Sequence, residues 1–336
     1  MATSNEEFAT TDAATPALSV IMPVYNVERF IDEAIDSVLD QTFTDLELVI
    51  VDDASTDSTW EIVTKRAVDE PRVRVIRNER NLGAAAAANI GIRAAFAPLI
   101  ARMDGDDISV PTRFEKQVAT LNTHPHFAVV GTFASHINEL GRLLSLSGTG
   151  PTTEAEFNDL RRAGKPTMVF GGTALFTRNL FDQVGGYDPR IRVAEDLELF
   201  DRMADVGPVI AIPEPLLLYR LHPGSTVERT FLEGRRIHRF VAARRQAQNS
   251  GQNTMDLEQF IQWERDRPLW YRLRDRLQDN SQYHYRKAGL AFGGGNKAGM
   301  AWNLINAFLA NPLWVVRRLW QQRLSPTARA ASATRQ

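Results

Sequence analysis

Three carboxyl groups follow a short apolar run in the segment LIARMDGDDISVP, residues 99–111. Asp104, Asp106 and Asp107 are so close in the chain that their charges repel, which favours protonation or a neighbouring positive charge. Carboxylate oxygens suit a hard divalent cation, Mg²⁺ or Mn²⁺, and such a cation can neutralise a diphosphate leaving group. The alternative interpretation is a polar turn after a strand, where Asp and Gly are common.

A second acidic pair ends another apolar run, in LVIVDDASTDST at residues 48–59. At the end of a buried strand, Asp52 and Asp53 could accept hydrogen bonds from a nucleotide base or a ribose. They could instead cap the next helix, but Ser55 or Asp57 is able to cap it without them. The pair therefore indicates a binding role beyond capping.

A third acidic pair, Glu195-Asp196, lies in the segment AEDLELFDRM. One of these carboxylates could act as a general base that takes a proton from a hydroxyl group. The alternative is that both acids stabilise the positive N-terminal end of a helix. In the downstream segment YRLHPGS, Arg220 could pair with phosphate, and His222 could bind a metal ion or be structural.

The residues around these groups predict alternating strands and helices. Strands are expected over residues 18–25, 46–53, 73–78 and 99–104, and helices over 27–41, 55–70 and 82–96. This alternation predicts an α/β fold with a mostly parallel central sheet and helices on both faces. Because ligands bind outside the carboxyl ends of such strands, the polar residues at the three strand ends are expected to converge on one crevice.

Later segments depart from this pattern. A strand is expected over residues 127–138 and a short helix over 194–207, whereas the prolines within 208–225 argue against a central antiparallel strand throughout that segment. Gly171 and Gly172 would let the backbone approach a ligand closely, or they could form a bulge in an edge strand.

Composition places limits on the kind of protein. The chain has 336 residues and no cysteine, which excludes disulfides and cysteine nucleophiles. Residues 1–16 are polar and lack the features of a secretory signal, so we expect a disordered tail. Residues 226–336 carry 19 Lys and Arg against 8 Asp and Glu, whereas residues 1–225 carry 20 against 33. This asymmetry indicates two regions with different partners.

Seven segments occur in a fixed order: SVIMPVYN, VIVDDASTDST, NERNLGAAAAANIG, RMDGDD, GGTALFTRNLFDQVGGYDP, AEDLELFDRM and YRLHPGS. Together they resemble the family 2 glycosyltransferases over residues 17–225. The resemblance implies a GT-A-type, nucleotide-diphospho-sugar transferase fold in that region, followed by a basic helical region over 226–336. It further implies a UDP-sugar donor, Mn²⁺ or Mg²⁺, inversion at the sugar, and a glycan or lipid-linked acceptor in cell-surface polysaccharide synthesis. Gly105 and the five alanines at 84–88 are departures from the family pattern.

The resemblance also implies a role for individual residues. The residues implied to bind the nucleotide-sugar are Pro23, Tyr25, Asn26, Asp52, Asp53, Arg80, Asn81, Gly83, Asp104 and Arg220, with Asp53 recognising the base. The implied metal ligands are Asp104, Asp106 and His222, and the implied general base is Asp196, with Glu195 beside it. Gly171 and Gly172 are implied to line the acceptor side.

The C-terminal region suggests a membrane partner. Residues 298–316 carry no charge, but three asparagines and Pro312 within them argue against a membrane span. From Pro312 onward, apolar side chains share one helix face while Arg317, Arg318 and Arg323 are available to the other, which is typical of a helix at a membrane interface. The alternative is a set of helices packed on the catalytic domain with a solvated arginine face.

We therefore expect a cytoplasmic enzyme that attaches peripherally to an anionic membrane surface. No recognition motif supports nucleic-acid binding. Two other functions fit part of the pattern: a nucleotidyltransferase, which could use a similar sheet and metal carboxylates, and a non-catalytic protein that binds sugar nucleotides.

Overall fold

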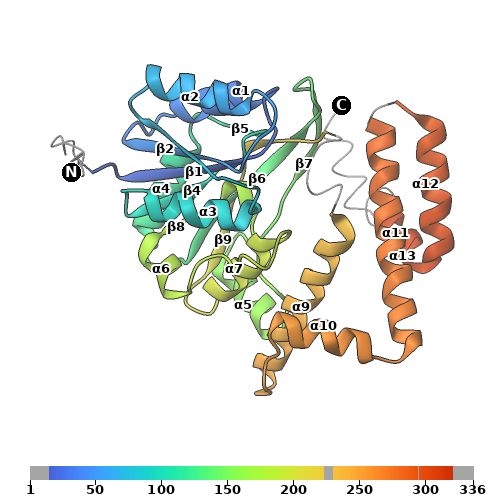
Figure 1. The fold of residues 1–336 in the computed structure, drawn as a ribbon. Coiled ribbons are helices and arrows are strands. Elements are labelled where there is room, and N and C mark those ends of the chain that lie inside the picture. The colour runs from blue at the N-terminus through green and yellow to red at the C-terminus, as the bar shows by residue number, and fades with distance from the viewer. Residues whose placement is uncertain (1–14, 223–229, 294, 321–336) are drawn as a thin grey trace, which may run out of the picture. The chain divides into compact units, whose positions relative to one another are not determined.

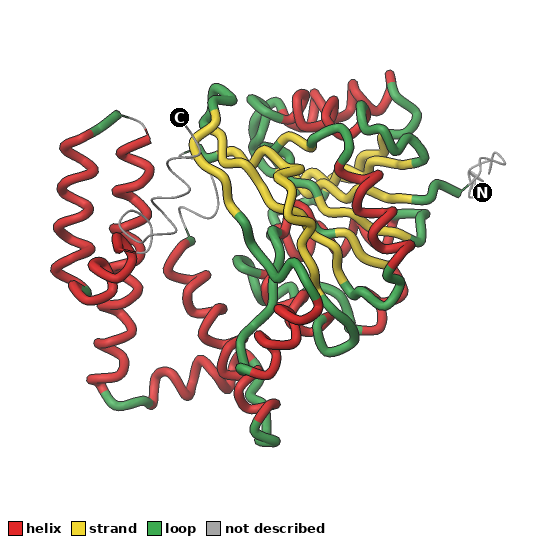
Figure 2. The backbone as a smooth tube through the Cα atoms, turned by 180° about the vertical axis from the view of Figure 1, so that it is seen from behind, coloured by secondary structure: helices red, strands yellow, loops and turns green. Residues whose placement is uncertain are grey.

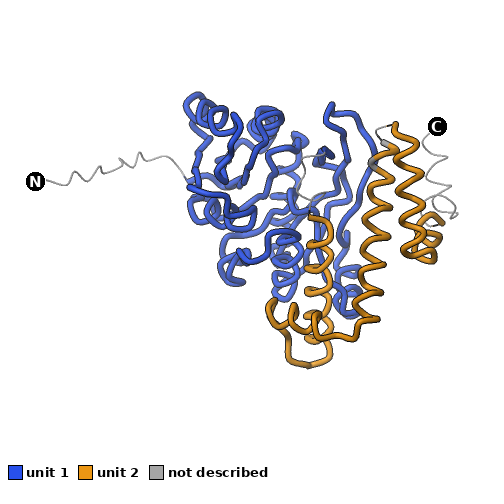
Figure 3. The backbone as a smooth tube through the Cα atoms, turned by 45° about the vertical axis from the view of Figure 1, so that its right-hand side comes forward, with its two compact units in different colours: residues 1–223 blue, residues 224–336 orange. Residues whose placement is uncertain are grey.

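The computed structural model describes residues 15–222, 230–293 and 295–320. The chain divides into two compact units, residues 1–223 and 224–336 (Figure 3). Residues 1–14 of the expected disordered tail, the expected domain boundary at 225/226 and Arg323 lie outside the described residues.

Unit 1 contains the sheet and most of the predicted motifs. Its strands are β1 (Leu18–Val24), β2 (Leu46–Asp52), β3 (Val73–Arg77), β4 (Leu99–Arg102), β5 (Ile108–Ser109), β6 (Val129–Ile137), β7 (Leu143–Ser147), β8 (Leu175–Thr177) and β9 (Val209–Arg220). Its helices are α1 (Ile31–Leu39), α2 (Thr59–Asp69), α3 (Ala84–Ala94), α4 (Arg113–Thr123), α5 (Glu154–Arg162), α6 (Arg178–Gln183) and α7 (Glu195–Met203). A short 3₁₀ turn, η1, covers Gly171–Thr173.

The strands form one sheet with helices around it (Figures 1 and 2). The strand order is β3-β2-β1-β4-β8-β6-β9-β5, and β7 pairs with β6. Strands β1 to β4 are parallel, whereas β8 runs antiparallel to both β4 and β6. The expected α/β fold with a sheet flanked by helices is confirmed, and the sheet as a whole is mixed. Because β2 and β4 lie on opposite sides of β1, the strand order reverses there, which is where such sheets bind ligands.

The alanine run in α3 has a packing explanation. Ala85, Ala87 and Ala88 are buried, and a Cβ at Gly91 would lie 2.7 Å from Ile21 Cγ2 in β1. The helix therefore packs so closely on the sheet that only small side chains fit at the contact. This close packing fixes the position of the loop that enters α3 and of the polar residues along the helix.

The strand within residues 208–225 is continuous, but it is parallel to β6 and antiparallel only to the short β5. β9 runs without a break through Pro213 and Pro215, pairing with β6 on one side and with the two-residue β5 on the other. Both prolines are exposed, and the β6–β9 register shifts beside them. A bulge of this kind tolerates proline because no ladder hydrogen bond is lost there.

The described part of unit 2 consists of helices and the loops that join them. Its helices are α9 (Phe231–Asn249), α10 (Leu257–Asp266), α11 (Leu269–Gly293), α12 (Lys297–Ala310) and α13 (Pro312–Leu319). Arg239 joins Glu264 of α10 to Asp279 of α11, and Asn311 caps α13 by accepting a hydrogen bond from the backbone of Trp314. Across residues 15–222, 230–293 and 295–320, no helix combines the length and apolar character that a membrane span requires.

Candidate active site

The loops after β1 and β2 are joined by hydrogen bonds. The backbone N–H of Asn26 donates to Ser55 Oγ at 3.0 Å, and the backbone N–H of Thr56 donates to Asn26 Oδ1 at 2.8 Å. Tyr25 is exposed beside them, whereas Pro23 lies within β1 and pairs with Val51. The structure therefore brings the predicted residues Tyr25 and Asn26 next to the loop that follows Asp53.

Asp53 holds the loop that precedes α3. Its Oδ1 accepts hydrogen bonds from Asn78 Nδ2 at 2.7 Å and from the backbone of Leu82 at 2.9 Å, and its Oδ2 accepts from Gly83 N at 2.8 Å. Gly83, the N-cap of α3, has a φ of +91°, a conformation that favours glycine. Recognition of a base by Asp53 stays a prediction, and the structure adds this positioning role.

The other predicted residues of this region have different surroundings. Asp52 is fully buried, accepts a hydrogen bond from Ser55 N at 3.3 Å, and pairs with Arg77 at 3.3 Å. Arg80 and Asn81 are exposed on the loop that Asp53 fixes. They are therefore free to approach a ligand near the N-terminus of α3, where backbone N–H groups favour phosphate.

The acidic cluster after β4 contains three carboxyl groups with distinct environments. Asp104 Oδ1 lies 3.3 Å from Arg102 Nη2, and Asp106 Oδ2 lies 2.9 Å from His222 Nε2. Asp107 accepts a hydrogen bond at Oδ1 from the backbone of Arg220, but its buried Oδ2 has no hydrogen-bond partner in the described part of the chain.

Burial changes the ionisation of this cluster. Burial and the neighbouring carboxylates raise the pKa of Asp104 to about 6, against the opposing charge of Arg102. The pKa of Asp107 is raised well above its usual value, first by burial and then by Asp106 and Asp104. A cation brought to this cluster would therefore favour its ionised form.

Two buried arginines, Arg102 and Arg113, supply positive charge beside the acids, and neither is among the site residues expected from the sequence. Burial would lower the pKa of Arg102, but Tyr187 and the nearby carboxylates raise it above its usual value. Arg113 Nη2 donates to Arg102 O at 2.6 Å, and its charge lowers the pKa of Asp104. Arg102 ends β4 two residues before Asp104 in the segment RMDGDD, and this short spacing is the sequence signal that could have indicated the pair.

Arg220 is buried and already has partners. Its Nη2 pairs with Glu33 at 2.6 Å, its Nε donates to Asp106 O at 2.8 Å, and its Nη1 donates to Glu139 O at 3.1 Å. The guanidinium therefore holds the loop that carries Asp106. A contact between Arg220 and a diphosphate stays a prediction, and the structure accounts for this residue by a positioning role.

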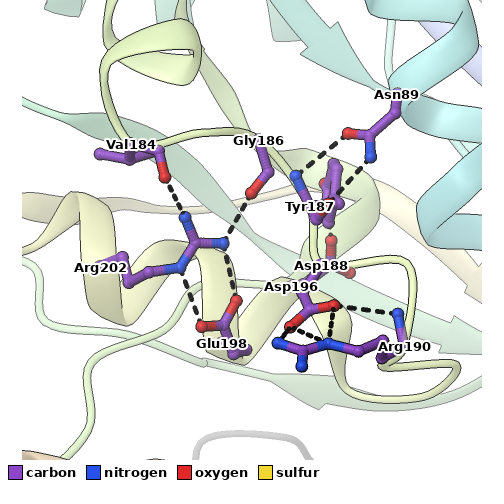
Figure 4. A network of polar contacts seen from close by, with 9 residues as sticks. All are labelled: Asn89, Val184, Gly186, Tyr187, Asp188, Arg190, Asp196, Glu198 and Arg202. Carbon is purple, nitrogen blue, oxygen red and sulfur yellow. Dashed lines mark hydrogen bonds and ion pairs between the residues drawn. The ribbon is translucent and has the colours of Figure 1, made fainter. Parts of the chain in front are cut away.

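The start of α7 carries the third acidic pair. Asp196 Oδ1 accepts a 2.8 Å hydrogen bond from the hydroxyl of Tyr187 (Figure 4). Desolvation and the charge of Asp196 raise the pKa of Glu195 to about 8. Glu195 is therefore mostly protonated at neutral pH.

The Gly171-Gly172 pair lies in the 3₁₀ turn η1, against these acids. A Cβ at Gly171 would lie 1.6 Å from Asp196 Oδ2, and a Cβ at Gly172 would lie 3.0 Å from Asp104 Oδ2. The turn thus brings the acids after β4 and the acid at the start of α7 together around one backbone segment. This arrangement differs from the edge-strand bulge considered from the sequence.

The metal ligands expected from the family resemblance are Asp104, Asp106 and His222. Among residues 15–222, 230–293 and 295–320, no group of three or more His, Asp or Glu side chains is arranged to hold a metal ion. Asp106 and His222 are adjacent, and the unpartnered Asp107 Oδ2 is nearby in the chain. Such a partial oxygen and nitrogen set suits a cation whose other ligands come from phosphate oxygens and water.

Comparison with known proteins identifies the family by sequence. Residues 19–185 match the family model described as Glycosyl transferase family 2. EpsE of Bacillus subtilis (strain 168), which is named as a glycosyltransferase, is 36% identical over 195 residues, covering 57% of this chain and 68% of that relative. Chondroitin synthase of Escherichia coli is 31% identical over 193 residues, covering 57% of this chain and 27% of that relative.

Solved structures share the fold. S. aureus TarS 1–349 in complex with UDP aligns with a TM-score of 0.52 at 20% identity, covering 85% of this chain and 88% of that one. The mannosyltransferase PcManGT from Pyrobaculum calidifontis, in complex with GDP-Man and Mn²⁺, aligns with a TM-score of 0.50 at 22% identity, covering 96% and 80%. With its motifs in order, its sheet and these relatives, the chain belongs to glycosyltransferase family 2.

Proposed function

We propose that this chain transfers a sugar from a nucleotide-diphospho-sugar, a UDP-sugar, to a hydroxyl group of a glycan or lipid-linked acceptor, with inversion at the sugar. The observation that carries the proposal is the approach of Asp196 and Asp104 to the two glycines of one turn. A base for the acceptor hydroxyl and acids that bind the donor are then close enough to act on one sugar. The relationship to chondroitin synthase supports a role in surface polysaccharide synthesis.

The donor would bind across the carboxyl ends of β1, β2 and β4. Tyr25, Asn26 and Asp53 would contact the nucleotide, with Pro23 and Asp52 shaping that side. Arg80, Asn81 and Gly83 would lie near the diphosphate at the N-terminus of α3. The UDP complex of TarS, which shares the fold, supports UDP as the nucleotide.

A divalent cation, Mn²⁺ or Mg²⁺, would be held by Asp106 and His222, with Asp104 beside them. When bound, it would neutralise the negative charge of the departing diphosphate. The Mn²⁺ complex of the mannosyltransferase supports a metal in this fold. Arg220 would keep Asp106 in place through its bonds to Asp106 O and Glu33.

Asp196 would take the proton from the acceptor hydroxyl as that oxygen attacks the anomeric carbon. The developing positive charge on the sugar resembles that in glycoside hydrolysis. Gly171 and Gly172 would border the acceptor side and leave room for the attacking oxygen. Glu195, which is largely neutral at pH 7, adds no second negative charge next to the base.

We also propose that unit 2 attaches the enzyme to the cytoplasmic face of an anionic membrane. From α12 to the end of α13, large apolar side chains recur every three or four residues. Each of them is 55–84% exposed: Trp302, Ile305, Leu309, Leu313, Val316 and, directly after α13, Trp320. Residues 297–320 contain Lys297, Arg317 and Arg318 but no acid. Apolar and aromatic side chains with only basic neighbours fit an anionic lipid surface, where lipid-linked acceptors reside.

Replacing the proposed base separates sugar transfer from the alternative of nucleotidyl transfer. Asp196→Asn should lower kcat by about 10²–10⁴-fold because a positioned base supplies an acceleration of that order. Glu195→Gln should lower kcat by at most about tenfold at pH 7, because Gln resembles the protonated acid already present. The rate of UDP release measures kcat. UDP affinity, measured by calorimetry, should stay unchanged in both variants. Substantial activity of Asp196→Asn would contradict the base assignment.

The glycine turn can be tested with a single methyl group. Gly171→Ala should lower kcat on the order of 100-fold, because the added Cβ displaces the Asp196 carboxylate from its position. Gly234→Ala in α9 is the matched control, because a Cβ there meets no atom within 4 Å, and it should behave as the parent protein. Equal kcat for Gly171→Ala and the control would refute the arrangement.

Membrane attachment is tested with vesicles of phosphatidylcholine alone or with phosphatidylglycerol. The full chain should sediment with the anionic vesicles, and the triple variant Trp302→Ser, Leu309→Ser, Leu313→Ser should stay in the supernatant. The matched control replaces exposed apolar residues elsewhere, namely Val68, Leu140 and Val206. Undiminished sedimentation of the triple variant would contradict the proposal. The proposal would also be contradicted if the chain formed an oligomer in solution and the triple variant dissociated this oligomer while the control variant did not.

A further inference from the structure

The carboxylate of Asp196 has two fixed neighbours. Its Oδ1 accepts the 2.8 Å hydrogen bond from the hydroxyl of Tyr187, and its Oδ2 lies against the backbone of Gly171. One hydrogen bond and one steric contact therefore define how the carboxylate is oriented. The charged or titratable groups around this pair are Arg102, Asp104 and Glu195.

Tyr187 is itself held by a side chain from α3. The amide of Asn89 donates through Nδ2 to Tyr187 O at 2.9 Å, and its Oδ1 accepts from Tyr187 N at 3.0 Å (Figure 4). The Tyr187 ring is buried and packs on Phe181 at a centroid distance of 5.9 Å. Backbone and ring are thus both fixed, which leaves the hydroxyl little freedom.

The turn before Tyr187 is tied to the helix that carries Asp196. Arg202 of α7 donates to the carbonyl oxygens of Val184 and Gly186 and pairs with Glu198 on its own helix (Figure 4). Gly186 has a φ of +71°, and a Cβ there would lie 3.1 Å from Asn89 Oδ1. The loop therefore joins α3 and α7 through a small set of directional contacts.

We propose that Tyr187 is a positioning residue that orients Asp196 for its reaction with the acceptor, and that Asn89 holds Tyr187 in the position this requires. The inference rests on the proposed function, in which Asp196 is the base. Burial, followed by the charge of Asp196, raises the pKa of Tyr187 well above its usual value, so the hydroxyl keeps its proton and remains a donor. A phenylalanine would supply the same packing but not the hydrogen bond.

The test compares Tyr187→Phe with the parent protein and with Tyr271→Phe, which removes a hydroxyl from α11. Tyr187→Phe should lower kcat by about 10–100-fold, the range expected when a hydrogen bond to a charged group is lost. KM for the donor and UDP affinity by calorimetry should stay unchanged, because the ring and the donor site are intact. Tyr271→Phe should behave as the parent protein.

A double-mutant cycle tests the part played by Asn89. Asn89→Ala should lower kcat in the parent protein but have much less effect in Tyr187→Phe, since Asn89 would act through the missing hydroxyl. Additive effects, an unchanged kcat of Tyr187→Phe, or a parallel loss of UDP affinity would each overturn the inference. Asp196→Asn is measured alongside to separate the two possible failures. If Asp196→Asn is inactive while Tyr187→Phe has normal activity, only the inference about Tyr187 fails. If Asp196→Asn is active, the assignment of Asp196 as the base fails.

Discussion

The gathering of carboxyl groups around one glycine turn is the constraint on which the rest of the structure depends. Asp104, Asp107 and Glu195 have raised pKa values because burial and mutual repulsion penalise their charged forms. Arg102 and Arg113 offset part of this penalty without being exposed to solvent. A buried acidic cluster of this kind costs stability unless a cation or hydrogen bonds compensate it, so its presence indicates a functional reason.

The elements that position the site form a connected scaffold. Asp53 fixes the loop that leads into α3, and α3 packs tightly on β1 through Gly91. Asn89 on the same helix clamps Tyr187, whose hydroxyl reaches Asp196. The helix that begins beside the proposed donor loop therefore also orients the proposed base. Its small residues are a requirement of this packing, which gives the alanine run a physical reason.

The first part of the fold, from β1 to β4, could be predicted from local sequence patterns. The strands and helices from β1 to β4 follow from apolar periodicity, and the strand ends that carry Asn26, Asp53 and Asp104 follow from the alternation. The family resemblance identified Glu195-Asp196, which the sequence pattern alone could not separate from helix-end acids. Tyr187 and Asn89 were missed because they meet across 98 residues of chain, and no spacing rule predicts such a contact. The partners of Arg220, Glu33 among them, were hidden for the same reason.

The central claim is that the acidic cluster after β4, with Asp106, Asp104 and the neighbouring His222, binds a divalent cation together with a nucleotide diphosphate. The direct measurement is electron paramagnetic resonance of free Mn²⁺ titrated with the protein in the presence of UDP or of UMP, with protein-free nucleotide as the blank. The account predicts that the protein removes Mn²⁺ from solution far more effectively with UDP than with UMP, because the cation needs diphosphate oxygens to complete its ligand shell. Equal uptake with both nucleotides, or none with UDP, would contradict it.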